Sequence, residues 1–405
     1  MSYGVFRRFA AVLTSCLFAL SVQTSAQEAK PSQEVKLGGD ASLTIRGILS
    51  STVFLQDARF GLGNGQQAEF VQQELAGWWH GGDVRNMRLT FEFRGPQLTG
   101  TWRGNATFEA DFFGGFNGAG AFGDEQPLPR IRLAYADLTN GRTTFRVGQA
   151  WSLTLGNIPV STSHIGFPLG WGSGGFIGWR FPGLFVMHAL SPSDAATRAQ
   201  LQFGVMKGSW VDETAADQPS AGEAGIPQLE ARLNIDGRLS GGTWGAYVVG
   251  HWDRKDLNNV RADTAAEPSE NNLDGYALEG GARMQRGRLT LHGNAYTGKA
   301  MAHQFAHIVQ FGDIKGWGAW AQAGLDLNKL WSIWLYAGAE NPDDDDIVSP
   351  NDRLESFLVV PMLRFKTGPY SLGLEWLHNR TEYRVASATD DRTGNQISFS
   401  ARFDF

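Results

Sequence analysis

Polar and apolar residues alternate with a period of two along most of the chain. The segments 84–95, 101–113 and 228–239 show this best, with aliphatic and aromatic residues on one face and several charged residues on the other. This period is typical of β-strands, because successive side chains point to opposite faces of a sheet. Helical periodicity extends over no more than a few turns, so the pattern predicts an all-β chain.

Clusters of Gly, Pro, Asn and Asp divide the chain into about 16 such segments. The expected strands are residues 42–55, 84–95, 101–113, 130–139, 143–151, 176–190, 197–208, 226–239, 243–253, 273–286, 288–298, 315–327, 331–340, 353–366, 369–384 and 395–405. Short connections such as 240–242 alternate with long ones such as 254–272. Residues 176–190 contain Pro182 and Gly183 and could form two strands, but two would reverse the alternation downstream. We therefore interpret this segment as one bent strand.

The strand faces favour a barrel in a membrane over a sheet in water. The last segment carries apolar residues at every odd position from Ile397 to Phe405 and polar residues between them. A soluble sheet with one wet face would show the same alternation, but many strands with charged faces suit lipid outside and water inside. The alternating connections fit an even-numbered barrel with both ends on one side. The predicted fold is an all-β, transmembrane antiparallel β-barrel of about 16 strands over residues 42–405.

Tryptophan is frequent for a chain of this length, with 14 residues. Those on the expected outward faces are Trp102, Trp151, Trp244, Trp252, Trp317, Trp331 and Trp376. Their amphipathic rings favour the membrane–water interface, and packing inside a sheet core is the alternative.

The N-terminal residues are typical of a secretory signal peptide. Two arginines precede a short apolar stretch, and small residues before Ala26 suit cleavage there. The expected division is a signal peptide over 1–26, a short periplasmic segment over 27–41 and then the barrel, which places the chain in the bacterial outer membrane. Cys16 lies in a segment that loosely resembles a lipoprotein cleavage box, but the apolar run continues past it.

Composition argues against several classes of function. The formal net charge is −6, with 35 Lys and Arg against 41 Asp and Glu, which does not favour nucleic acid as a partner. Cys16 is the only cysteine, so the chain without its signal peptide would have neither disulfides nor cysteine-based metal sites. No cofactor is expected.

A barrel of this size encloses a lumen that side chains alone do not fill. The long connection 152–174 is unusually apolar for an external loop, and its only group that titrates near neutral pH is His164. We expect it to fold inward against the wall and to narrow the channel. An external loop used in subunit packing is the alternative.

Arginines are frequent on the expected inward faces near this loop. By parity the inward arginines are Arg88, Arg94, Arg103, Arg130, Arg132, Arg146 and Arg180, and the main inward acids are Glu109 and Asp111. Arginines in a narrow pore give a positive field and bidentate donors for carboxylate or phosphate. They could instead pair with the acids and only stabilise the wall. Because the loop brings almost no acid, we favour a positive excess and predict a preference for anionic solutes.

Other candidate sites are weaker. His303 and His307 have the i, i+4 spacing of two metal ligands on a helix, but solvated loop histidines are commoner. Asp343 to Asp346 could hold a divalent cation, although a solvated acidic loop is the commoner state. We assign no metal site. The 8 histidines also lack a serine or acid partner at motif spacing, so no enzyme is expected.

Residues 85 to about 168 resemble the DcaP-like trimeric porins of Gram-negative bacteria. The resemblance is carried by the segments Arg88-Leu89-Thr90-Phe91, Glu109-Ala110-Asp111-Phe112-Phe113-Gly114, Arg130 to Tyr135 and Gly148-Gln149-Ala150-Trp151-Ser152. It implies a homotrimer of barrels, surrounded by outer-membrane lipid and lipopolysaccharide, that pass small anionic solutes such as dicarboxylates. Several members carry an N-terminal coiled coil, for which residues 27–40 offer no heptads.

The expected function is therefore passive diffusion of small hydrophilic solutes, with anions favoured. Two alternatives remain open at this point. One is an outer-membrane barrel enzyme that hydrolyses lipids or esters, and the other is a structural or adhesive barrel.

Overall fold

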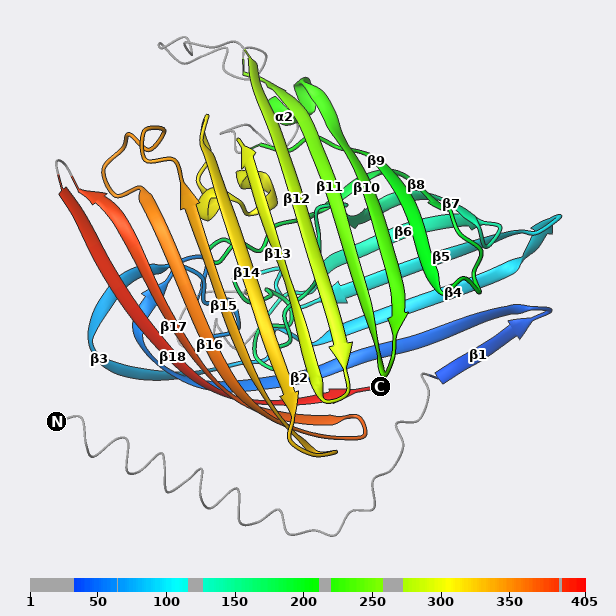
Figure 1. Cartoon of the computed structure of the whole chain (residues 1–405), viewed down its shortest axis with the longest axis horizontal. Helices are drawn as coiled ribbons and strands as arrows, with labels where there is room; N and C mark the ends of the chain where they lie inside the picture. The colour runs from blue at the N-terminus through cyan, green and yellow to red at the C-terminus, as the bar shows by residue number, and fades with distance from the viewer. Residues whose placement is uncertain (1–32, 64, 116–126, 211–219, 258–271, 386–387) are drawn as a thin grey trace.

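The computed structural model of the chain describes residues 33–63, 65–115, 127–210, 220–257, 272–385 and 388–405. Its strands form one sheet that curves into a barrel (Figure 1). The expected signal peptide over 1–26 lies outside the described residues. None of the described helices is long and apolar enough to cross a membrane.

The elements follow one another as an almost unbroken series of strands. The strands are β1 (Gln33–Gly38), β2 (Ala41–Phe60), β3 (Val71–Asp83), β4 (Arg88–Thr99), β5 (Trp102–Asp111), β6 (Arg130–Thr139), β7 (Thr143–Trp151), β8 (Arg180–Ala189), β9 (Thr197–Met206), β10 (Ile226–Leu239), β11 (Gly242–Asp256), β12 (Asn272–Arg286), β13 (Leu289–Lys299), β14 (Lys315–Asp326), β15 (Trp331–Pro342), β16 (Arg353–Thr367), β17 (Tyr370–Val385) and β18 (Ala388–Asp404). The short helices are η1 (Gly65–Gln67), α2 (Ala221–Ala224), η3 (Ala302–Gln304) and η4 (His307–Val309).

The sheet closes on itself through antiparallel pairs. β18 pairs with β2, from Gln396 opposite Gln56 to Asp404 opposite Ile48, and β9 pairs with β10. Closure pairs the last strand of the wall with the first, which satisfies backbone hydrogen bonds that lipid could not. Residues 176–190 contribute a single strand, as expected, but this strand, β8, begins only at Arg180 because residues 176–179 still belong to the preceding connection.

The region after β2 corrects one sequence-based expectation. We expected residues 56–83 to be a long loop, but β2 extends to Phe60 and β3 follows it. β3 pairs with residues 52–60 of β2, and β4 pairs with residues 42–48. β3 and β4 therefore share one position in the wall, interrupted at residues 84–87. Strand β3 was missed because its sequence, VQQELAGWWHGGD, does not alternate cleanly.

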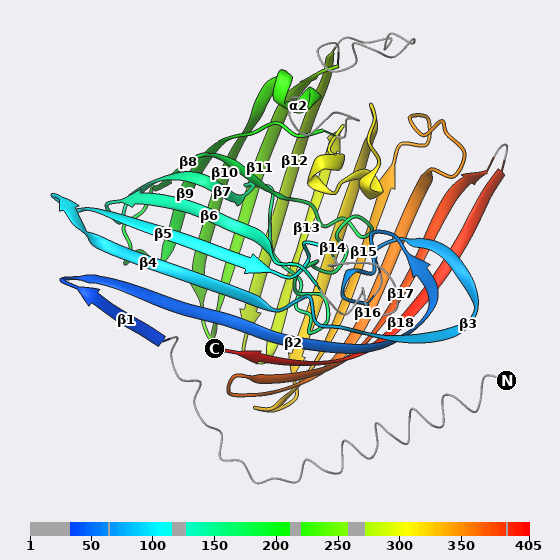
Figure 2. The same ribbon diagram turned by 180° about the vertical axis from the view of Figure 1, so that it is seen from behind.

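The described residues consequently form a wall with 16 strand positions, as predicted, although their sheet contains 18 strands. The remaining strand, β1, comes from the segment expected to be a short periplasmic extension. It forms a hairpin with β2, with Gln33 opposite Ile45, while Phe405 pairs with Gly47 through two backbone hydrogen bonds. β1 thus continues the line of β18 along the same edge of β2 (Figure 2).

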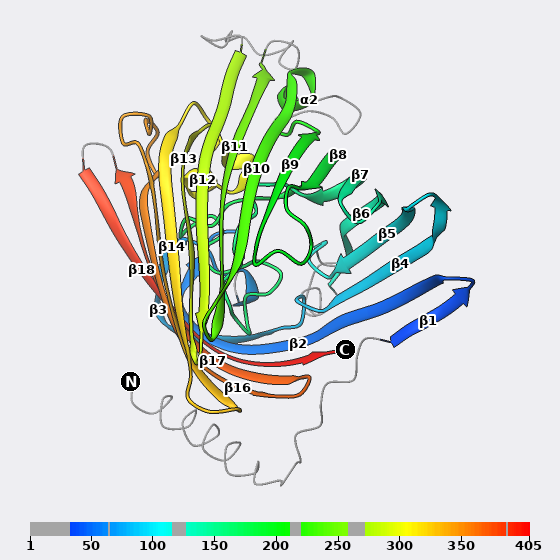
Figure 3. The same ribbon diagram turned by 45° about the vertical axis from the view of Figure 1, so that its right-hand side comes forward.

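The two ends of the barrel differ as the alternation of connections predicted. Short turns such as those between β10 and β11 and between β16 and β17 lie at the end where the C-terminus lies (Figure 3). The long connections lie at the opposite end. The β17–β18 hairpin is longer than expected, with strand pairing up to Val385 and Ala388.

Side chains alternate between an apolar outside and a largely polar inside. On β18, Gln396, Ser398 and Ser400 are buried, and on β17 the ring of Trp376 is exposed. Trp151 is an exception to the predicted outward tryptophans. Its ring packs inside the barrel against Trp171, with 6.0 Å between ring centroids, because the chain turns into the lumen directly after it.

Candidate functional site

Residues 152–179, between β7 and β8, fold into the lumen and contact the opposite wall. The backbone N–H and C=O of Val160 each hydrogen-bond to the side chain of Gln322 on β14, both at 2.7 Å. Nearer the start of the loop, the Glu230 carboxylate of β10 accepts a hydrogen bond from the N–H of Leu153. These contacts confirm that the loop folds inward. We call residues 152–179 the lumen loop.

The tip of the lumen loop is anchored on one buried carboxylate. Glu375 of β17 accepts hydrogen bonds from the Ser161 hydroxyl at 2.7 Å, from the N–H and hydroxyl of Thr162 at 2.6 and 2.5 Å, and from the N–H of Ser163 at 2.9 Å. Bonds to a charged acceptor are stronger than neutral ones, so this carboxylate fixes the tip.

The break between β3 and β4 supplies the second anchor. Asn86 lies in this break, and its side-chain amide donates to the C=O of Ser163 and accepts from the N–H of Gly166, the latter at 2.6 Å. Arg88, two residues later, donates to the C=O of Ile165 at 3.1 Å. The interruption of the wall therefore places polar side chains where the loop crosses it.

An apolar cluster supports the rest of the lumen loop. Its loop members are Phe167, Leu169, Trp171 and Phe176, and its wall members include Trp320, Tyr336 and Leu358. The Tyr336 hydroxyl donates to the C=O of Gly174 at 3.0 Å. This packing explains why the loop is so apolar, since its side chains cover the wall inside the lumen.

Four of the predicted arginines come together beside the loop with both predicted acids. Arg132 donates to Glu109 and to Asp111, each at 2.7 Å, and its side chain is 2% exposed. Arg130 forms a bidentate pair with Asp111 at 3.0 and 2.8 Å. Arg88 forms a longer ion pair, with 3.7 Å between its Nε and Oε1 of Glu109.

Arg180 is the fourth member, and it lacks an acidic partner. In the part of the chain that the structure describes, it makes no ion pair, and its Nη1 has no hydrogen-bond partner. Its guanidinium instead stacks over the rings of Trp151 and Trp179, at 4.7 and 4.3 Å from their centroids. Among the described residues, four arginines therefore face two carboxylates. We call Arg88, Arg130, Arg132 and Arg180 the arginine cluster.

The other predicted pore residues lie elsewhere. Arg103 pairs with Asp40 in the β1–β2 turn at 2.5 Å, and Arg94 is exposed near the same end. Arg146 forms a bidentate pair with Asp137 at 2.8 and 2.9 Å. The structure therefore does not bring these three into the arginine cluster.

His164 lies at the loop tip and is 4% exposed. Its Nδ1 is 2.9 Å from the Ser163 hydroxyl. Burial lowers the pKa of His164, and the nearby carboxylates of Glu375 and Asp83 oppose that effect. This histidine therefore helps to pack the tip and does not contact the arginine cluster.

A pocket of about 260 Å³ lies beside the first residues of the lumen loop. Its lining includes Arg146, Trp151, Gln202, Arg232 and Asn234. Arg232 donates to the C=O groups of Leu153 and Leu155, both at 2.7 Å. Arg232 was not among the predicted pore residues, although its position on the polar face of β10 was a usable signal.

His303 and His307 correct another expectation. We regarded solvated loop histidines as the commoner case, but both are buried, with 6% and 0% of their surface exposed. They also lie on two separate helical turns, η3 and η4, and not on one helix.

In the loop at Asp343 to Asp346, Asp346 accepts a hydrogen bond from the N–H of Lys315 at 2.9 Å.

Solved structures of bacterial outer-membrane proteins share this fold. The chain is similar to the outer membrane channel DcaP of Acinetobacter baumannii, with a TM-score of 0.68 and 15% identity over 94% of this chain and 100% of that one. It is also similar to an anion-selective porin from Comamonas acidovorans, with a TM-score of 0.56 and 12% identity over 90% of this chain and 100% of that one.

A third similar structure is the trimer form of OmpT, an outer membrane protein of Vibrio cholerae. Its TM-score is 0.53, with 9% identity over 90% of this chain and 99% of that one. No protein-family model matches the chain, and no curated protein sequence matches it either. The fold is thus that of outer-membrane porins. At these identities the similarity to DcaP, like the others, is a similarity of fold.

Proposed function

We propose that this chain is a porin of the bacterial outer membrane, and that small hydrophilic solutes diffuse passively through its lumen with anions favoured. The observation that carries the proposal is the arginine cluster beside the lumen loop. Four guanidinium groups outnumber the two carboxylates among them, and Arg180 has no acidic partner among the described residues. A fixed positive charge in a narrowed, partly desolvated pore attracts anions.

The chemistry of the cluster favours carboxylates among the anions. Guanidinium groups bind carboxylate and phosphate through two parallel hydrogen bonds, which a chloride ion cannot accept. Arg88 and Arg130 keep 18% and 21% of their side chains exposed, so they are the members that a small dicarboxylate would contact. Arg132 and Arg180 are buried and would act through their charge. The similar porin from Comamonas acidovorans is described as anion-selective, which agrees with this direction of selectivity.

The proposal is tested by the reversal potential of single channels in a planar bilayer under a salt gradient. The wild-type channel should favour anions. The variant Arg180→Gln removes the arginine of the cluster that has no acidic partner among the described residues. The reversal potential should therefore shift in the direction that indicates lower anion selectivity.

The matched control is Arg103→Gln, which makes the same change in charge but removes an arginine paired with Asp40 at the far end of β5. It should leave the selectivity near that of the wild type. A wild-type channel that favours cations, or equal shifts in the two variants, would contradict the proposal.

Two other functions would give different results in the same experiment. A barrel that hydrolyses lipids or esters, and a structural or adhesive barrel, would show no defined conductance steps. The first would also release product from a chromogenic ester. We favour neither, because the serine that lies beside a histidine, Ser163 next to His164, is buried at the tip of the lumen loop and offers no nucleophile at an open surface.

A further inference from the structure

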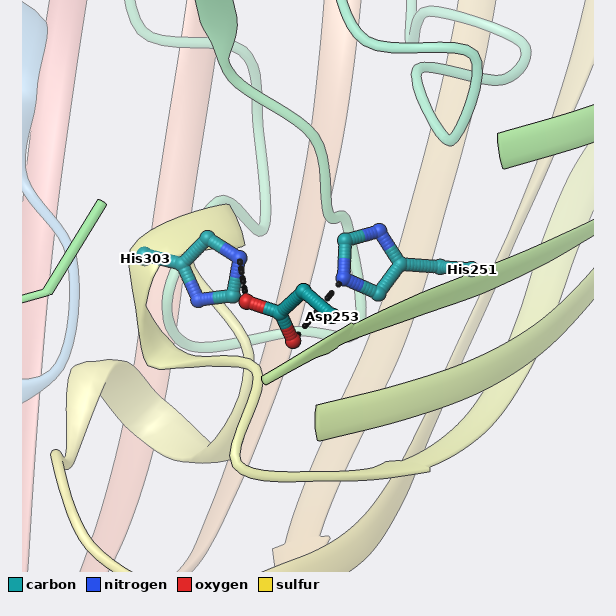
Figure 4. A group of neighbouring side chains, drawn as sticks. All are labelled: His251, Asp253 and His303. Atoms are coloured by element: carbon teal, nitrogen blue, oxygen red, sulfur yellow. Dashed lines mark ion pairs between the residues drawn. The ribbon is translucent and has the colours of Figure 1, made fainter. Parts of the chain in front are cut away.

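His251, Asp253 and His303 form a buried cluster inside the barrel (Figure 4). His251 and Asp253 alternate along β11, so both point into the lumen. His303 comes from η3, in the connection after β13 that folds over them. The three side chains are 0–1% exposed, so water does not solvate their polar atoms.

The facing atoms of this cluster have no other partners. His251 Nε2, Asp253 Oδ2 and both ring nitrogens of His303 lack hydrogen-bond partners among the described residues. His251 Nε2 lies 3.5 Å from Asp253 Oδ1, and His303 Nε2 lies 3.9 Å from Asp253 Oδ2. Buried polar atoms without partners cost free energy, so their convergence on one point requires an explanation.

A carboxylate behind the cluster orients one of its rings. Glu230 on β10 is 2.8 Å from Nδ1 of His251. A proton on Nδ1 bonded to this carboxylate leaves the lone pair of Nε2 directed at Asp253 and His303. This arrangement of carboxylate, histidine and open nitrogen is the one that orients histidine ligands in metal sites.

Lys255 is the neighbour that could oppose a cation. Its ammonium group donates to Asp253 Oδ1 at 2.8 Å and to the C=O of Ala300 at 2.9 Å, and it lies over the Trp210 ring. These contacts occupy Oδ1 and leave Oδ2 available. The carboxylates of Glu230 and Asp253 also outnumber this single ammonium.

A proton on His251 would be the simplest alternative occupant. It could bridge Glu230 and Asp253 through the two ring nitrogens of His251. It would leave both nitrogens of His303 without partners, because neither bonds to another described residue. A cation bound between all three side chains would satisfy one of these nitrogens as well.

We propose that His251, Asp253 and His303 bind a divalent transition metal, with Zn²⁺ the ion that fits best. Two imidazole nitrogens and one carboxylate oxygen are a common zinc ligand set, and they leave a position for water or an anion. The three ligand atoms lie within 4.8 Å of one another, whereas tetrahedral zinc sites need separations of about 3.3 Å. Side-chain movements of about 1 Å would therefore complete the site.

Binding there would act on the lumen loop. Gln304, next to His303, accepts hydrogen bonds from the Ser152 hydroxyl at 3.0 Å and from the N–H of Trp179 at 2.9 Å. These residues are the two ends of the loop. A metal on His303 would thus hold the loop more firmly, and metal binding should raise the unfolding temperature of the chain.

The test is a titration of the purified, metal-free chain, prepared without a histidine tag, with Zn²⁺ by calorimetry and with Co²⁺ by visible absorption. The expected result is one saturable site per chain and a Co²⁺ spectrum of low coordination number. His303→Ala should weaken binding at least about tenfold, and Asp253→Asn should do the same.

The matched control is His188→Ala, which removes a histidine that bonds to Thr143 near the short-turn end of β8. It should bind Zn²⁺ like the wild type. Circular dichroism of each variant checks that the barrel is folded. No saturable binding by the folded wild type, or equal binding by wild type and folded His303→Ala, would overturn the proposal. Because binding is measured without conductance, the result does not depend on the porin function.

Discussion

At the scale of single residues, the partners of each buried arginine decide how much positive charge it adds to the pore. Arg132 bonds to two carboxylates, whereas Arg180 stacks on two aromatic rings and makes no ion pair among the described residues, so the two contribute differently to the field of the pore. A desolvated cation over an aromatic ring gains about 2 kcal/mol, which compensates Arg180 in part without neutralising it. The unpaired arginine is therefore the residue whose replacement should change selectivity most.

His164 gives the prediction for pH. Burial lowers its pKa below the ordinary value of 6.5, so the folded chain binds this proton more weakly than the unfolded chain does. Its contribution to stability is therefore present above pH 6.5 and is lost as the pH falls through the folded-state pKa. Thermal unfolding followed by circular dichroism should show this loss in the wild type and a weaker pH dependence in His164→Gln. Identical pH profiles for the two proteins would contradict this prediction.

At the scale of elements, the lumen loop is held by anchors on distant strands. Glu375 on β17 and Asn86 between β3 and β4 bond to neighbouring residues at the tip. The apolar cluster around Trp171 then fixes the return path. Because each anchor lies on a different part of the rigid wall, the position of the loop depends on the closure of the barrel.

The variant Glu375→Ala tests this anchoring. It leaves the donors of Ser161, Thr162 and Ser163 without their acceptor, so we expect a loss of about 3 kcal/mol in unfolding free energy. The released tip should also make single-channel currents noisier. Asp194→Ala, at an exposed position between β8 and β9, also removes a carboxylate; it is the control and should change neither quantity. Quiet wild-type-like currents from Glu375→Ala would show that the tip is held by other contacts.

At the scale of the whole molecule, closure between β18 and β2 produces a wall with polar residues inside and apolar residues outside. Such a barrel can pack against copies of itself in the membrane, and the similar OmpT structure is described as a trimer form. We predict that the chain is a homotrimer in mild detergent. Native mass spectrometry should give three times the chain mass, and heating in dodecyl sulfate should dissociate it. A single-chain mass under native conditions would contradict this prediction.

The sequence by itself determined the architecture. Alternation fixes which residues of each strand face lipid, since successive side chains must point to opposite sides, and turn residues fix where strands end. Alternation and turn residues were sufficient for the 16 strand positions of the wall and for the single strand β8. The apolar composition of residues 152–174 predicted the inward course of the lumen loop. It failed for β3, where both faces carry polar residues, and for Trp151, which lies where the chain leaves the wall.

Only the tertiary structure decided which side chains meet. Parity placed seven arginines on the inside, but their height in the wall depends on the register of strands far apart in sequence. Arg103 and Arg132 both face inward, yet one pairs with Asp40 near the end of the barrel and the other with Asp111 beside the loop. Likewise, His251 and His303 come together only because the connection after β13 folds over β11. A periodic pattern specifies the direction of a side chain, whereas the partner that it meets depends on the closed barrel.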